Sequence, residues 1–150
     1  MIAICFYAEL ADSAGARRRS WTWKALAHPF EVDKILCVDE FPDLPRGSDF
    51  NDVEVYDSLS AMKSAYPSAT YVHVEAEAGT NLADFTHPDP TGDVVYCFGR
   101  NAGGFKLDAD QSVGEWVHIG CHHEEDSTDS IWADQAAAIV VSHRYFASLS

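Results

Sequence analysis

Basic residues are scarce in this sequence. Lysine and arginine together number 10, against 24 aspartates and glutamates, which gives a formal net charge of −14. An acidic surface repels nucleic-acid phosphates at long range, so charge alone argues against a nucleic-acid partner. The acidic charge is explained either by adaptation to a salty cytoplasm, where screening weakens the repulsion, or by binding to a basic protein partner. Composition does not choose between these two explanations.

Long apolar runs and paired cysteines are also missing. No apolar stretch approaches the roughly 20 residues of a membrane span, so we expect no membrane partner. The run that opens the chain, residues 2–7, lacks the basic start and cleavage site of a signal peptide, which predicts a cytoplasmic protein. The four cysteines form no CxxC pair, which argues against a disulfide framework and against zinc. Residues 121–126 carry Cys121, His122 and His123, but adjacent histidines rarely face one ion, so we expect a polar loop there and no metal.

What the sequence does contain is material for a core. The chain has 150 residues, of which 47% are hydrophobic, and this predicts one domain over 1–150. Short apolar runs alternate with helical patterns, which predicts an α/β fold with a mostly parallel sheet flanked by helices. The expected strands are 2–7, 33–38, 53–56, 70–75, 92–98 and 115–119, and the expected helices are 14–27, 58–65 and 130–146.

The last expected helix has a periodic face. Residues at i, i+3 and i+4 spacing share one side of a helix. The residues on this side are Ile131, Gln135, Ala138, Ile139, Ser142 and Phe146. The alanines at 136–138 permit close packing.

Four of the ten basic residues fall between positions 17 and 24, and Trp21 and Trp23 lie among them. Aromatic faces beside arginines can hold a base or a sugar, which would make Arg17, Arg18 and Lys24 RNA-binding residues. A helix with one solvated basic face and a buried tryptophan explains the same residues. Taken alone, they leave both explanations open.

Three segments resemble the motifs of one enzyme family. Residues 98–105 read Phe-Gly-Arg-Asn-Ala-Gly-Gly-Phe and follow an apolar run, and residues 130–139 read Ser-Ile-Trp-Ala-Asp-Gln-Ala-Ala-Ala-Ile. Residues 13–19 read Ser-Ala-Gly-Ala-Arg-Arg-Arg. These segments are similar, in order and spacing, to the three motifs of the SpoU branch of the SPOUT (α/β-knot) RNA methyltransferases. Residues 13–19 resemble the first motif, Asn-x-Gly-x-x-x-Arg, and residues 98–105 resemble the second, Phe-Gly-x-Glu-x-x-Gly-Leu. Residues 130–139 resemble the third, Ser-Leu-Asn-x-x-x-Ala-x-Ala-Ile. The likeness covers nearly the whole chain and matches the minimal, single-domain members.

The resemblance implies a fold and an assembly. It implies a C-terminal deep trefoil knot over about residues 92–146. It also implies a homodimer that pairs through the first and last helices, with the site at the subunit boundary.

The resemblance further implies a cofactor, S-adenosylmethionine, and an RNA substrate, most simply a tRNA ribose 2′-hydroxyl. In this family the cofactor is held largely by backbone groups of three loops, which correspond here to 75–79, 98–104 and 119–132. Side-chain changes would therefore leave cofactor binding intact. The implied cofactor-binding residues are Glu75, Ala76, Phe98, Gly99, Arg100, Gly103, Ile119, Gly120, Ser130, Ile131 and Ala136.

The implied catalytic residues are Arg19, Ser13 and Asn101. Arg19 matches the arginine of the first motif; its guanidinium is a poor base, and it would bind phosphate or stabilise a developing alkoxide. The sequence departs from the family at Ser13, at Asn101 in place of a glutamate, and at Trp132 in place of an asparagine. Two alternatives therefore stay open. One is a divergent protein that binds or consumes S-adenosylmethionine, and the other is a non-catalytic acidic protein that captures a basic partner.

Overall fold

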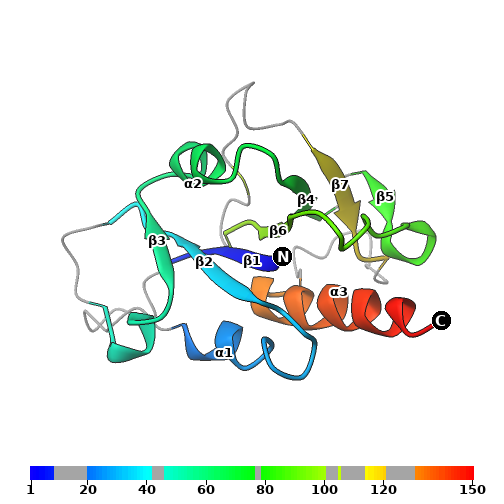
Figure 1. Ribbon diagram of the computed structural model, residues 1–150, viewed down its shortest axis with the longest axis horizontal. Coiled ribbons are helices and arrows are strands. Elements are labelled where there is room, and N and C mark those ends of the chain that lie inside the picture. Colours follow the sequence, from blue (N-terminus) through cyan, green and yellow to red (C-terminus); the bar gives the residue numbers. More distant parts are fainter. Residues whose placement is uncertain (9–19, 42–45, 77–78, 101–104, 106–113, 121–130) are drawn as a thin grey trace, which may run out of the picture.

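The computed structural model describes residues 1–8, 20–41, 46–76, 79–100, 105, 114–120 and 131–150. They form a seven-stranded sheet in the order β3-β2-β1-β6-β4-β7-β5, and every pairing is parallel (Figure 1). This confirms the predicted α/β class. The strands are β1 Ile2–Tyr7, β2 Lys34–Val38, β3 Glu54–Tyr56, β4 Thr70–Val74, β5 Thr80–Asn81, β6 Val94–Phe98 and β7 Glu115–His118.

Helices cover both faces of the sheet. Helix α2 (Leu59–Ala65) lies on one face, and α1 (Trp21–Lys24) and α3 (Ala133–Ser148) lie on the other (Figure 1). Two short 3-10 helices, η1 (Ser48–Phe50) and η2 (Leu82–Asp84), complete the described elements. None of the described helices is long and apolar enough to cross a membrane.

Strand β1 shows why the apolar runs form central strands. Its six residues are all buried, because alternate side chains enter two different cores. Ile4 and Phe6 join the core beneath α1 and α3, whereas Cys5 joins the core beneath α2. Residues Cys5, Cys37 and Cys97 are buried free thiols, as their apolar surroundings predict.

Helix α3 runs antiparallel to the neighbouring strands. Near its end, Arg144 donates hydrogen bonds to the carbonyl oxygens of Phe30 and Glu31, just before β2 begins. The helix therefore ends near the amino-terminal edge of the sheet. Its first residues, with Ala133 and Ala136 packed against the core, lie toward the edge where the strands end.

The periodic face of α3 noted in the sequence is not the face that the helix buries. The side chains that bury against the sheet are Ala137, Val140, Val141 and Arg144, while Ile139 is 39% exposed and Phe146 is 61% exposed. Both faces carry apolar residues at helical spacing, so periodicity could not distinguish them. The smaller side chains face the sheet, because they let the helix approach it closely.

The predicted helix over 14–27 is helical in its described part only over Trp21–Lys24, and turns follow it. Ser20 precedes the helix but does not cap it with its side chain. Its hydroxyl instead bonds to the carbonyl oxygen and a carboxylate oxygen of Asp49, each at 2.9 Å. A long-range contact thus takes the group that local capping would use.

Strand β7 lies between β4 and β5, although it follows both in the chain. The connection from β4 to β5 therefore crosses β7. At the crossing, Gly79 has a φ of +69°, and a Cβ atom there would lie 2.6 Å from the Cβ atom of Trp116 and clash with its backbone. The knot itself stays a prediction, because residues 101–104, 106–113 and 121–130 lie outside the described chain.

Candidate functional site

The expected cofactor loops leave three neighbouring strands. Strands β6, β4 and β7 are adjacent, and Val74 is in register with both Phe98 and Val117. Because the strands are parallel, they end at one edge of the sheet. Segments 75–76, 99–100 and 119–120 all begin there. Open parallel sheets bind ligands at this edge, outside the carboxyl ends of the strands.

Glu75 connects these segments. One carboxylate oxygen accepts a hydrogen bond from the backbone amide of Phe105 at 3.1 Å, and the other accepts one from the amide of Ala76 at 3.1 Å. The backbone amide of Glu75 donates to the carbonyl oxygen of Val117 at 3.1 Å. Glu75 therefore ties the segment after β4 to Phe105, which follows β6, and to strand β7 itself.

Arg100 is engaged within the protein. Its guanidinium forms an ion pair with Glu40, in which Nε lies 3.3 Å from Oε2, and its Cζ atom lies 4.0 Å from the centre of the Tyr7 ring. Burial raises the pKa of Tyr7, although the charge of Arg100 opposes that rise. The ring of Tyr7 in turn meets the edge of Phe105 at 6.0 Å between ring centres. Glu40 has no sequence signal of this pairing, because it follows a strand outside the expected cofactor loops.

Other expected cofactor residues contribute mainly backbone or packing. Phe98 is 1% exposed and packs near Trp23, so its side chain belongs to the core. Ile119 and Ala136 pack against the same core. Gly120 lies so close to Asn81 that a Cβ atom on the glycine would overlap the amide group. Ile131, half-buried, precedes α3. This pattern leaves the main chain as the group that can face a ligand.

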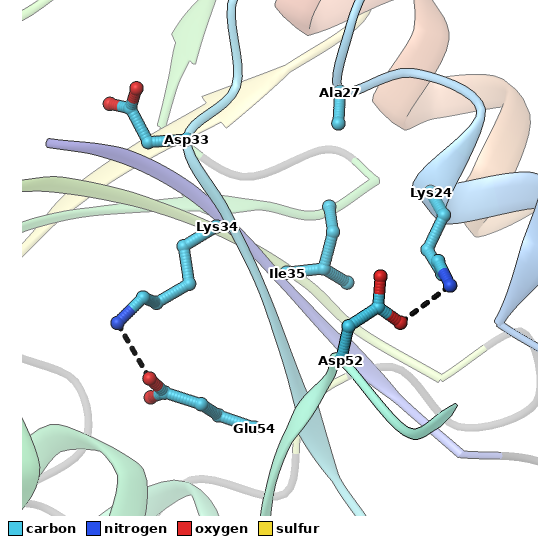
Figure 2. A pocket seen from close by; sticks show the side chains of 7 residues that line it. All are labelled: Lys24, Ala27, Asp33, Lys34, Ile35, Asp52 and Glu54. Carbon is cyan, nitrogen blue, oxygen red and sulfur yellow. Dashed lines mark hydrogen bonds and ion pairs between the residues drawn. The ribbon is translucent and has the colours of Figure 1, made fainter. Parts of the chain in front are cut away.

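Lys24 lies apart from the loops expected to bind the cofactor. It lines a cavity of about 260 Å³ together with residues at the amino-terminal ends of β2 and β3 (Figure 2). Its Nζ atom lies 2.5 Å from a carboxylate oxygen of Asp52 and 3.0 Å from the carbonyl oxygen of Asp49. A second ion pair, Lys34 with Glu54 at 2.6 Å, lies on the opposite side of the cavity.

His73 is a buried polar residue near the candidate site that was not predicted from the sequence. The imidazole of His73 is stacked on Trp116, and its Nε2 atom lies 2.9 Å from the Nζ atom of Lys63. Burial, and then the charge of Lys63, lower the pKa of His73 to about 4. Phe105 packs its edge against both aromatic rings. In the sequence, His73 is only a histidine within an apolar run, and nothing there indicates that Lys63 is its partner.

Several expected residues lie outside the described chain. They are Ser13, Arg17, Arg18, Arg19, Asn101, Gly103 and Ser130, together with the segment 121–126. Within the described part, no group of three or more histidine, cysteine, aspartate or glutamate side chains is suited to a metal ion.

These features define a class: a parallel α/β sheet with three tied loops at one edge. Solved structures match it along almost the whole chain. A protein whose structure concerns the 2-OH methylation of C/U34 on tRNA has a TM-score of 0.69 and 13% identity, with 99% of this chain and 95% of that chain covered. An AdoMet-bound rRNA methyltransferase from Sinorhizobium meliloti has a TM-score of 0.70 and 14% identity, with 99% and 57% covered.

The SpoU methyltransferase AviRb from Streptomyces viridochromogenes, in complex with AdoMet, has a TM-score of 0.66 and 13% identity, with 99% and 58% covered. No protein-family model and no curated protein matches the sequence. At this identity the likeness shows the fold. The chain has the fold of the SpoU-type RNA methyltransferases, as its motifs predicted.

Proposed function

We propose that this protein is an S-adenosylmethionine-dependent RNA methyltransferase that modifies a ribose 2′-hydroxyl, with tRNA as the substrate. The observation that carries the proposal is the meeting of the three expected cofactor loops at one edge of the sheet. Solved structures of the same fold include AdoMet-bound methyltransferases and a protein concerned with 2-OH methylation of tRNA. Fold likeness and loop placement therefore point to the same chemistry.

S-adenosylmethionine supplies an electrophilic methyl group, and the protein supplies positioning, which can contribute roughly 7–11 kcal/mol. The backbones at Ala76, Gly99 and Gly120 are the groups that would hold the cofactor. Glu75 holds Ala76 and Phe105 through its carboxylate, which accepts hydrogen bonds from their backbone amides, and it bonds to Val117 of β7 through its own backbone amide. The strongly acidic chain favours a cationic ligand such as a sulfonium.

For the acceptor, we assign Arg19 to the ribose and its phosphate. Its guanidinium would stabilise the oxygen as negative charge develops there, and Ser13 and Asn101 would complete a polar surround. Arg17 and Arg18 would bind neighbouring phosphates. Lys24 contributes less, because its ammonium is paired with Asp52.

The assembly we propose is a homodimer of a single knotted domain spanning 1–150, with the knot over about 92–146. Exposed apolar side chains on α3 support a contact between subunits. Ile139, Phe146 and Leu149 are 39%, 61% and 65% exposed, and spacings of seven and ten residues place them on one side of the helix. Pairing would bury this surface between the two subunits.

The test is transfer of labelled methyl groups to bulk tRNA, across a series of salt concentrations. We expect wild type to label tRNA and Arg19→Ala to lose about a hundredfold or more in rate, since it lacks the group that stabilises the charged oxygen. Arg18→Ala serves as the matched control and should instead weaken RNA binding in a salt-dependent way. Equal labelling by wild type and Arg19→Ala would remove Arg19 from this role.

A second candidate is a protein that binds or consumes S-adenosylmethionine without methylating RNA. The two motif substitutions at Asn101 and Trp132 favour it, and Trp132 is 63% exposed just before α3. Analysis of the cofactor after incubation without RNA separates the two functions. Breakdown of the cofactor in the absence of RNA, with no labelled tRNA, would support the second candidate.

A further inference from the structure

Glu40 and Arg100 lie on segments that follow two different strands, and one other strand lies between those two in the sheet. Glu40 follows β2 and Arg100 follows β6, and β1 lies between these strands and ends at Tyr7. Neighbouring strands are about 4.8 Å apart, so the ion pair must reach across the end of β1. It does so over the ring of Tyr7, with Cζ of Arg100 4.0 Å from the ring centre.

The same segment is also held at Phe105. The backbone amide of Phe105 donates to Glu75 at 3.1 Å, and its ring meets the edge of the Tyr7 ring. Residues 100 and 105, on either side of 101–104, are therefore fixed to β1 and β2 on one side and to β4 on the other. Residues that are held in place before a ligand arrives lose less conformational entropy when it binds.

We propose that Glu40 is a positioning residue for the cofactor site, acting through Arg100 and Tyr7 to hold the segment that follows β6. The inference rests on the proposed function, and it concerns a residue outside the three family motifs. Arg100 thereby takes a different role from the one expected. Its side chain secures the segment, and its backbone is left to face the ligand.

The arrangement suits an arginine specifically. The guanidinium is planar, so it can lie flat on the Tyr7 ring while its edge bonds to a carboxylate. The Arg100 side chain is only 13% exposed, and Glu40 is 40% exposed, so the pair is partly withdrawn from water. Such a pair is stronger than a fully solvated one, and loss of the carboxylate would loosen the guanidinium.

The experiment compares Glu40→Gln with Glu54→Gln, a matched variant that removes the carboxylate of the Lys34–Glu54 pair at the other edge of the sheet. Calorimetric titration with S-adenosylmethionine should show about fivefold to tenfold weaker binding for Glu40→Gln and less than twofold change for Glu54→Gln. Wild-type affinity in Glu40→Gln would overturn the proposal.

Amide hydrogen exchange separates this inference from the proposed function. The backbone amide of Phe105 should exchange faster in Glu40→Gln than in wild type or Glu54→Gln, whether or not a cofactor is present. If wild type binds no S-adenosylmethionine, the proposed function fails, and the exchange measurement alone decides whether Glu40 holds the segment. Unchanged exchange at Phe105 would show that it does not.

Discussion

His73 is a fully buried histidine whose ring nitrogens both have partners. Its Nδ1 atom lies 3.3 Å from the carbonyl oxygen of Glu115, which can only accept a hydrogen bond, so this nitrogen carries the proton. Nε2 is then left to accept a hydrogen bond from Lys63 at 2.9 Å. The ring is therefore neutral in the folded protein, and a second proton would meet the lysine charge in a buried place.

This neutral ring predicts a loss of stability in acid. The pKa of His73 is about 4 in the folded chain and 6.5 ordinarily, so the unfolded state binds the proton more readily between these values. The stability that the neutral His73 ring contributes is fully present above about pH 6.5. It is lost as the pH falls toward 4, and the loss is at most about 3 kcal/mol.

Urea unfolding at a series of pH values measures the effect of His73. We expect the decline between pH 6.5 and 4.5 to be smaller in His73→Gln than in wild type, and unchanged in His28→Gln, which alters an exposed histidine. Equal declines in wild type and His73→Gln would contradict the assignment. His87, whose pKa is also lowered to about 4 by burial and by His143, should account for part of what remains.

The contacts of individual side chains were harder to predict than the strands that carry them. The family resemblance named Arg100 and Phe98 as site residues, and both lie at the edge of the sheet where the strands end. It could not show that the Arg100 side chain pairs with Glu40 or that Phe98 points into the core, because both facts depend on contacts between strands distant in sequence.

At the scale of elements, the crossing at Gly79 is the tightest described point. A side chain there would meet the backbone of Trp116, and the positive φ is itself unfavourable for any residue with a Cβ atom. Only glycine lets the connection pass β7 at this distance.

Gly79→Ala should therefore destabilise the protein by about 2–4 kcal/mol, since it adds backbone strain to a steric clash. The matched control is Gly92→Ala, because nothing lies within 4 Å of a Cβ atom at Gly92. Urea denaturation should show a lower midpoint for Gly79→Ala and little change for Gly92→Ala. Similar midpoints for both variants would mean that the connection does not cross β7 so closely.

The sequence predicted every described strand except β5. Strands β1 and β6 are buried on both faces, so their unbroken apolar runs are unambiguous. Strand β5 has two residues and no apolar signature, and its pairing depends wholly on β7. The buried face of α3 could not be identified from periodicity, because both faces of the helix carry apolar residues at helical spacing.

At the scale of the whole molecule, the acidic charge of the protein opposes binding of the proposed RNA substrate. A net charge of −14 slows the approach of RNA, and this repulsion weakens as salt screens it. The parallel order of the strands was predictable from the alternation of elements. A knot is expected from the family resemblance alone, because composition and periodicity carry no information about which side of a loop the chain passes.

The central claim is that three segments at one sheet edge form a site for S-adenosylmethionine. Calorimetric titration of the wild-type chain with this cofactor tests it most directly, with ATP as a control ligand that shares the adenosine but lacks the sulfonium. We predict saturable binding of one cofactor per chain, competition by S-adenosylhomocysteine, and no comparable binding of ATP. No heat at millimolar cofactor, or equal binding of ATP, would contradict the account.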